Sequence, residues 1–114
     1  MTNQKSKLYK LQVFVPISHE EAVRKAIGDA GGGVIGNYDH CVSVTKSTGY
    51  FRPLENSNPA IGLKGEINSV EEVKLEFPCE ESKISSVIEA IKKANIYEEN
   101  LIDIIPMTRE EDLR

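Results

Sequence analysis

The sequence predicts one α+β domain whose elements follow the order strand, helix, strand, strand, helix, strand. Two stretches share the order strand, proline, acidic helix start and helix, one passing through Pro16 and the other through Pro78. Each helix is apolar along one stripe only, so both must cover the same face of a sheet. Two such halves in one antiparallel sheet make a ferredoxin-like βαββαβ sandwich, here with an extra β-hairpin and a long loop.

Length and composition limit the class of protein. The chain has 114 residues, the size of a single domain, and we place its core at about residues 8–107. Its 39% hydrophobic and 28% charged residues are typical of globular proteins. The net charge of −4 provides no broad cationic field for a phosphate backbone or an anionic membrane surface. We therefore expect neither nucleic acid nor membrane as a partner.

The expected location is the cytoplasm. Residues 2–7 are polar, and no apolar stretch of the kind found in an export signal follows them. Cys41 and Cys79 lie far apart in the sequence, and in a chain without such a signal we expect reduced thiols.

The first third of the chain predicts a strand and a helix, and the helix ends at a run of glycines. In residues 8–15 an apolar series of Tyr9, Leu11, Val13 and Val15 alternates with Lys10, Gln12 and Phe14, and Pro16 ends this predicted strand. Residues 18–21 form a predicted capping box, in which the Ser18 hydroxyl accepts from the first turn of the helix. Three glycines at 31–33 end the helix, since glycine adopts a left-handed conformation without steric cost.

The middle of the chain predicts two further strands and a loop. Residues 34–45 form the first, followed by a tight turn at 47–49 and a return strand beginning at residue 50. Residues 53–63, rich in Pro, Asn and Ser, form a loop, and the next strand spans 65–77. The acidic residues Glu71 and Glu72 are predicted to be exposed.

The last third predicts a helix and a final strand. Pro78 ends the preceding strand, and the acidic pair at 80–81 favours a helix start. An i, i+3, i+4, i+7 stripe then marks one buried face, formed by Ile84, Val87, Ile88 and Ile91. Residues 95–100 form a connector, and the final strand spans 101–105.

Two polar segments are the candidates for chemistry, and both leave an alternative open. His40 and Cys41 are metal-ligand types, although neighbours on a strand point to opposite faces. The alternative is that Cys41 packs in the core and His40 hydrogen-bonds locally. Tyr97, Glu98 and Glu99 offer paired carboxylates for acid–base work, or else form a solvated connector. The predicted ligand-binding residues are Asn37, Tyr38, His40, Tyr97, Glu98 and Glu99, with His40 and Cys41 as predicted ligands of a divalent metal ion.

One glycine motif is excluded. Gly31, Gly33 and Gly36 match the spacing G-x-G-x-x-G of dinucleotide-binding proteins. They follow a helix and precede a strand, whereas a phosphate site needs the helix to follow the glycines. We interpret them as a helix stop, and the cofactor stays unassigned.

Four segments together resemble a known module: residues 36–41, 48–54, 58–62 and 97–99. The sequence is similar, from about Leu8 to Met107, to the CutA-like or PII-like middle domain of the Nif-three-like proteins, often called GTP cyclohydrolase 1 type 2 homologs. The resemblance implies a homo-oligomer, with a trimer favoured. It also implies that the dinuclear metal site of longer relatives lies in flanking domains. In place of the family's histidine- and proline-containing connector, this chain has residues 95–100 without either residue.

Three functions follow from these observations. The first is a non-catalytic regulatory module: a standalone domain that senses a small ligand or metal ion. The second is an interaction module that docks on another, unknown protein through its sheet face or the 53–63 loop. The third, which we disfavour, is a metal-dependent enzyme; it requires the 38–41 and 97–99 segments to converge.

Overall fold

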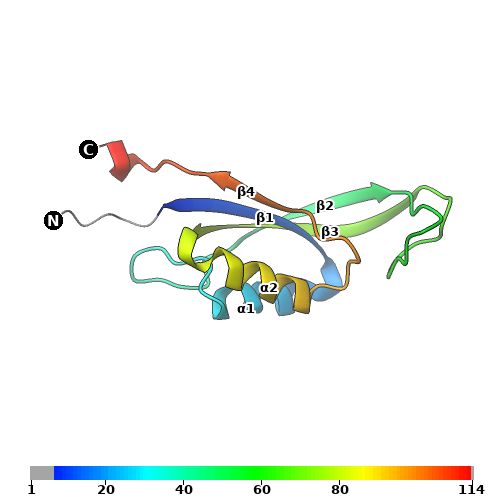
Figure 1. Cartoon of the computed structure of the whole chain (residues 1–114), viewed down its shortest axis with the longest axis horizontal. Coiled ribbons are helices and arrows are strands. Elements are labelled where there is room, and N and C mark those ends of the chain that lie inside the picture. The colour runs from blue at the N-terminus through cyan, green and yellow to red at the C-terminus, as the bar shows by residue number, and fades with distance from the viewer. Residues whose placement is uncertain (1–6, 114) are drawn as a thin grey trace.

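A computed structural model of the chain describes residues 7–113 (Figure 1). Residues 1–6, on which the expected absence of an export signal partly depends, lie outside this range. The elements are β1 (Leu8–Pro16), η1 (Ile17–His19), α1 (Glu20–Asp29), β2 (Ser43–Phe51), β3 (Asn68–Glu80), η2 (Glu81–Lys83), α2 (Ile84–Ala94), β4 (Ile102–Pro106) and η3 (Glu110–Leu113). The predicted βαββαβ order is confirmed.

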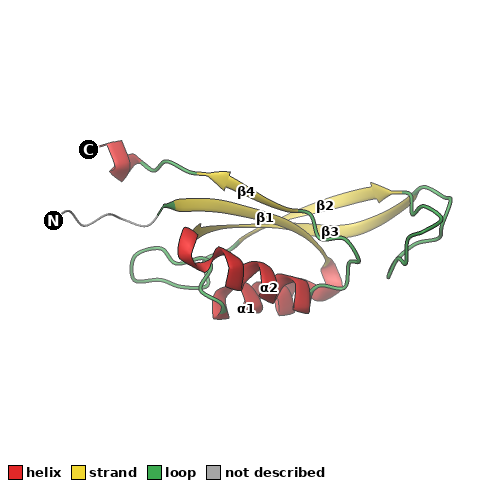
Figure 2. Ribbon diagram, viewed as in Figure 1, coloured by secondary structure: helices red, strands yellow, loops and turns green. Residues whose placement is uncertain are grey.

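The strands form one antiparallel sheet in the order β2-β3-β1-β4. Both helices lie against the same face of this sheet, as Figure 2 shows. Strands β2 and β3 extend past the end of β1, because Pro16 pairs with Glu72 while residues 68–71 pair with β2 alone. The β2–β3 hairpin therefore projects beyond the helices, and the molecule is 58 Å long.

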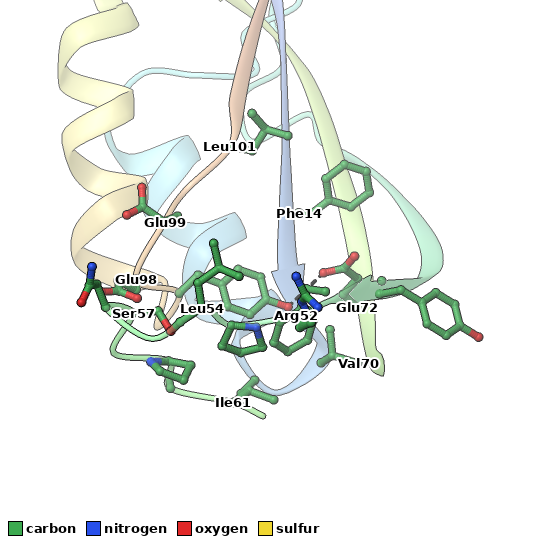
Figure 3. Close-up of a pocket in the computed structure, with 18 residues that line it drawn as sticks. Phe14, Arg52, Leu54, Ser57, Ile61, Val70, Glu72, Glu98, Glu99 and Leu101 are labelled. Atoms are coloured by element: carbon green, nitrogen blue, oxygen red, sulfur yellow. Dashed lines mark hydrogen bonds between the residues drawn. The ribbon is translucent and has the colours of Figure 1, made fainter. Parts of the chain in front are cut away.

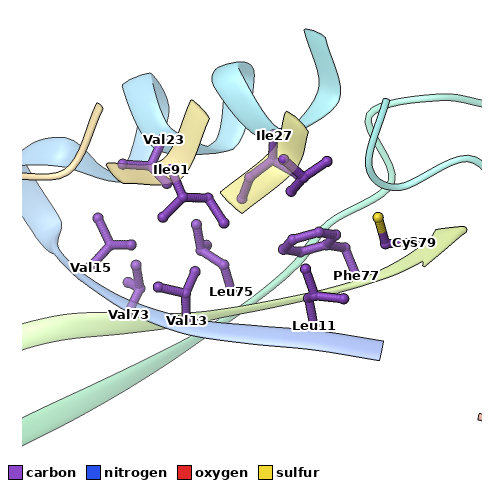
Figure 4. Close-up of a cluster of buried hydrophobic side chains, with 11 residues drawn as sticks. Leu11, Val13, Val15, Val23, Ile27, Val73, Leu75, Phe77, Cys79 and Ile91 are labelled. Atoms are coloured by element: carbon purple, nitrogen blue, oxygen red, sulfur yellow. The ribbon is translucent and has the colours of Figure 1, made fainter. Parts of the chain in front are cut away.

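The core lies between the sheet and the helices (Figure 4). Alternate residues of β1 and β3 face the helices, which supply one stripe each. The buried side chains in this layer are Leu11, Val13, Val15, Val23, Ile27, Val73, Leu75, Phe77, Cys79, Val87 and Ile91. Removing this much apolar surface from water is the main stabilising contribution to such a layer.

The predicted turn at residues 47–49 is wrong. Strand β2 runs through them without interruption, and the hairpin is formed by β2 and β3 themselves, joined by residues 52–67. The predicted strand at 34–45 is correct only from Ser43 onward. Before it, Ile35 and Tyr38 exchange backbone hydrogen bonds of 2.9 Å across a tight turn in which Gly36 has a φ of 57°.

Two local predictions at the helix starts are also wrong. The Ser18 hydroxyl lies 2.8 Å from Nδ1 of His19 and caps no helix, since α1 begins only after the η1 turn. Pro78 does not end β3, which continues to Glu80. The Pro78 carbonyl accepts a 2.7 Å bond from Gly33 N, away from β1. In an antiparallel sheet, the backbone nitrogen and carbonyl of one residue point toward the same neighbouring strand. The Pro78 nitrogen therefore also faces away from β1, and its lack of an N–H breaks no hydrogen bond between β3 and β1.

The other stop signals are confirmed: Pro16 is the last residue of β1, and α1 ends before three glycines. Gly31 has a φ of 102°, and Gly32 donates a 2.9 Å bond to the Ile27 carbonyl. Among residues 7–113, no helix has the length and apolar character needed to cross a bilayer.

Candidate functional site

A cleft of about 610 Å³ lies where the β2–β3 hairpin leaves the cover of the helices (Figure 3). Three segments line it: residues 49–61, which end β2 and begin the loop; the connector between α2 and β4; and open-face side chains of β1 and β3. Those side chains are Phe14, Val70 and Glu72, which alternate with the core residues of their strands. The cleft therefore joins segments that are distant in sequence.

Asn95 fixes the connector against the sheet. The residue is 8% exposed, and its Oδ1 accepts a 3.0 Å bond from Ile96 N. Its Nδ2 donates to Asn100 Oδ1 at 2.9 Å and to the Phe14 carbonyl at 3.4 Å. A buried amide with these partners turns the chain sharply after α2 and directs residues 97–99 toward the hairpin.

A hydrogen bond joins the connector to the base of the hairpin. The Tyr97 hydroxyl donates to Glu72 Oε2 at 2.9 Å, and the Glu72 residue is only 8% exposed. Burial, together with this bond to Glu72, raises the pKa of Tyr97 well above its usual value. Gly49, which pairs with Val70, lies beside the same carboxylate, and a Cβ there would collide with Glu72 Oε1.

A second contact joins the connector to the loop. The Asn58 backbone N–H donates to Glu98 Oε1 at 2.9 Å. The loop is also held internally, because Ser57 Oγ donates to the Leu54 carbonyl at 2.6 Å and Gly65 N to the Pro53 carbonyl at 2.8 Å. The loop is thus an ordered wall of the cleft.

The cleft combines apolar walls with an acidic charge balance. Its charged lining residues are Glu72, Glu98, Glu99 and Arg52. Within residues 7–113, Glu72 forms no ion pair with a cationic side chain. The rest of the lining is largely apolar, with Phe14, Leu54, Ile61 and Leu101 around the opening in Figure 3. Such a cleft suits a small molecule with a hydrocarbon surface and a polar end.

The structure separates the two predicted site segments. Tyr97, Glu98 and Glu99 line the cleft. Residues 37–41 lie at the other end of the helices, beyond the end of α1 (Figure 1). Asn37, Tyr38 and His40 do not line the cleft, and their binding of a ligand stays a prediction.

His40 and Cys41 have local partners. The two ring nitrogens of His40 lie 2.9 Å from Asp29 Oδ1 and 3.0 Å from Asp39 Oδ1, and these bonds, first with Asp29, raise the pKa of His40. Cys41 is half-buried outside the core, so the alternative that it packs there is wrong. Its thiol lies 3.6 Å from the Asp39 carbonyl. In the part of the chain that the structure describes, no group of three or more His, Cys, Asp or Glu side chains is placed to hold a metal ion.

Sequence reasoning missed Phe14, Arg52 and Glu72 as cleft residues, and the prediction that Glu72 is exposed is wrong. The available signal was the alternation of β3, which places Glu72 on the face opposite Val73. That pattern gives the face but not the connector that covers it.

Comparison with known proteins places the chain among longer relatives. No family model matches it. It is 46% identical, over 103 residues, to a GTP cyclohydrolase 1 type 2 homolog of Halalkalibacterium halodurans, covering 90% of this chain and 28% of the relative. The solved structure of a Bacillus cereus protein related to NIF3 matches with a TM-score of 0.82 and 39% identity, over 96% of this chain and 28% of that one.

A more distant structure shows the fold alone. The PII-like protein CutA from Nostoc sp. PCC 7120 matches with a TM-score of 0.62 and 18% identity, over 87% of this chain and 80% of that one. The predicted CutA- and PII-like architecture is therefore confirmed. The chain spans 28% of the length of the relative that it matches at 46% identity.

Proposed function

We propose that the chain, which is similar to one segment of longer GTP cyclohydrolase 1 type 2 homologs and of a protein related to NIF3, is a non-catalytic regulatory module that senses a small ligand. One observation carries the proposal: the cleft is walled by three segments that touch one another through few hydrogen bonds. A ligand in it would contact the hairpin, the loop and the connector together. Binding would thereby change how firmly the projecting hairpin is held.

The chemistry of the cleft supports binding over catalysis. The lining contains no histidine, cysteine or lysine among the described residues. Its Ser57 hydroxyl donates to a backbone carbonyl instead of meeting a base. The raised pKa of Tyr97 keeps that hydroxyl protonated. The carboxylates of the lining are Glu72, Glu98 and Glu99, and two of them already accept hydrogen bonds that hold the connector to the hairpin and the loop.

We also propose that the module acts as a homo-oligomer, with a trimer favoured. The outer edges of β2 and β4 carry no further strand among residues 7–113. Ile104 and Ile105 of β4 are 43% and 40% exposed. Unpaired edges with exposed apolar side chains favour contacts between copies. Metal sensing by His40 and Cys41 would need further ligands, and a neighbouring copy is their proposed source.

Native mass spectrometry of the purified protein tests subunit number, bound metal and co-purified small molecules in one spectrum. We expect an oligomer and, in a thermal-shift screen of metabolites, at least one compound that raises the Tm. That increase should be smaller in a Leu101→Ala variant, which shortens a cleft wall, than in Leu113→Ala, far from the cleft. A monomer whose Tm no metabolite or metal ion changes would refute the proposal.

A second candidate is an interaction module that docks on another protein. The loop carries exposed apolar side chains, with Leu54 62% and Leu63 66% exposed. Exposed apolar residues on a projecting loop are typical of docking surfaces. A pull-down comparing the native chain with Leu63→Asp tests this function, and recovery of no protein specific to the native chain counts against it.

A further inference from the structure

The charge of the cleft indicates the chemical class of its ligand. We propose that the cleft takes a small organic cation: an apolar or aromatic body that carries a protonated amine, with the amine directed at Glu72. This inference rests on the proposed function, because it names the ligand class of the same cleft.

Glu72 is a largely buried residue whose Oε1 accepts no hydrogen bond from the described residues and is not fully enclosed by protein. It is 8% exposed, and its Oε2 accepts one hydrogen bond, from Tyr97. A carboxylate has two oxygens and about four acceptor sites, so one neutral donor leaves most of its capacity unused. Buried charges in proteins are normally paired with an opposite charge. No cationic side chain of residues 7–113 pairs with Glu72, and a ligand ammonium would supply the missing charge.

The remaining charges of the lining favour the same sign of ligand. Glu98 and Glu99 lie on the connector wall, and Arg52 is the lining's cation among the described residues. Three carboxylates against one guanidinium repel an anionic ligand.

A metal ion fits the cleft poorly. The described residues contain no group of three or more carboxylate, histidine or cysteine side chains that could hold one. Glu98 Oε1 already accepts the Asn58 amide, which turns that carboxylate toward the loop. The walls include Phe14, Phe51 and Val70, which match a hydrocarbon body and not a hydrated ion.

Three probes that share a phenylethyl group separate charge from hydrophobic contact: 2-phenylethylamine, its neutral analogue 2-phenylethanol, and the anion 3-phenylpropanoate, whose carboxylate is larger than the other two end groups. Binding is followed by the amide NMR signals of Phe14, Glu72 and Leu101 in the native chain. We expect the amine to bind at least about tenfold more tightly than the alcohol, and the anion to bind more weakly than either. In Glu72→Gln the advantage of the amine over the alcohol should fall about tenfold.

Glu71→Gln is the matched control, because it removes the same charge from the neighbouring β3 residue, which is exposed and faces the opposite side of the sheet. It should leave the affinity for the amine unchanged. Glu99→Gln provides an independent variant outside the sheet, and we expect a loss of about threefold there. If Glu72→Gln does not fold, the comparison of the three probes on the native chain and the Glu99→Gln variant decides the question.

The outcomes separate this inference from the proposed function. Cleft signals that respond equally or more strongly to the alcohol or the anion would overturn the cationic class and leave ligand binding in place. An unchanged amine advantage in Glu72→Gln, or an equal loss in Glu71→Gln, would also overturn it. Cleft signals that respond to none of the three probes, together with a metabolite screen that changes no Tm, would overturn both.

Discussion

Tyr97→Phe removes the one hydroxyl that joins the connector to the buried Glu72 carboxylate. The 2.9 Å bond is part-buried, and a hydrogen bond to a charged group contributes about 1.5–3 kcal/mol. Because the tyrosine keeps some solvent access, we expect the lower end, a loss of about 1.5 kcal/mol in the free energy of unfolding. With a urea m-value of about 2 kcal/mol per M, the unfolding midpoint should fall by about 0.8 M.

A double-mutant cycle isolates this contact. Glu72→Gln keeps an acceptor of the same shape but loses the charge, so it should cost about 0.5–1 kcal/mol alone. Tyr97→Phe should then cost less in the Glu72→Gln chain than in the native one, by about 1 kcal/mol. Tyr38→Phe is the control, since Tyr38 is 75% exposed and its loss of a hydroxyl should change stability by less than about 0.5 kcal/mol. Equal midpoints for Tyr97→Phe and Tyr38→Phe, or additive costs in the cycle, would refute the coupling of connector and hairpin.

Three other perturbations test the remaining parts of the structure. Ile91→Ala should cost about 2–5 kcal/mol in urea unfolding, because Ile91 is fully buried between α2 and the sheet; a cost below about 1 kcal/mol contradicts the packing. His40 has a pKa raised above 6.5, chiefly by Asp29, so its ion pairs stabilise the fold fully below pH 6.5 and progressively less as the pH rises through the folded pKa. Asp29→Asn should therefore lower the His40 pKa in an NMR titration, and an unchanged value excludes the pair. Gly49→Ala should displace the Glu72 carboxylate and cost about 1–2 kcal/mol; the cost should largely disappear in the Tyr97→Phe background, and full additivity would contradict the arrangement.

The sequence predicted those elements whose signals are local. The alternation of residues 8–15 and the apolar stripe through Val87 and Ile91 depend on periodicity alone, and both are confirmed. The turn expected at Gly49 failed because a glycine inside a strand has the same local appearance as a glycine in a turn. Its reason is non-local: the residue lies across from Val70 and leaves room for the carboxylate of Glu72.

The candidate site, like the fold, was predictable only where its signal is local in the sequence. Tyr97 and the two acidic residues after it were identified because polar residues gather there, and they line the cleft. The burial of Glu72 could not be predicted, since it depends on a connector 25 residues away in sequence. The segment at 37–41 was chosen for its density of reactive side chains. In the structure, His40 there joins its loop to α1 through Asp29.

The position of the cleft follows from where the core ends. Beyond Glu72 the sheet narrows to the two strands β2 and β3, with neither helix to cover them. A two-stranded ribbon is marginally stable in water by itself, so this part of the hairpin depends on contacts with the loop and the connector. Those contacts include the bonds that Glu72 and Glu98 accept, and they surround the cleft. A ligand held there adds its binding free energy to the least supported part of the fold. On the proposed function, the same geometry that leaves the hairpin dependent on these contacts would make its order sensitive to the occupancy of the cleft.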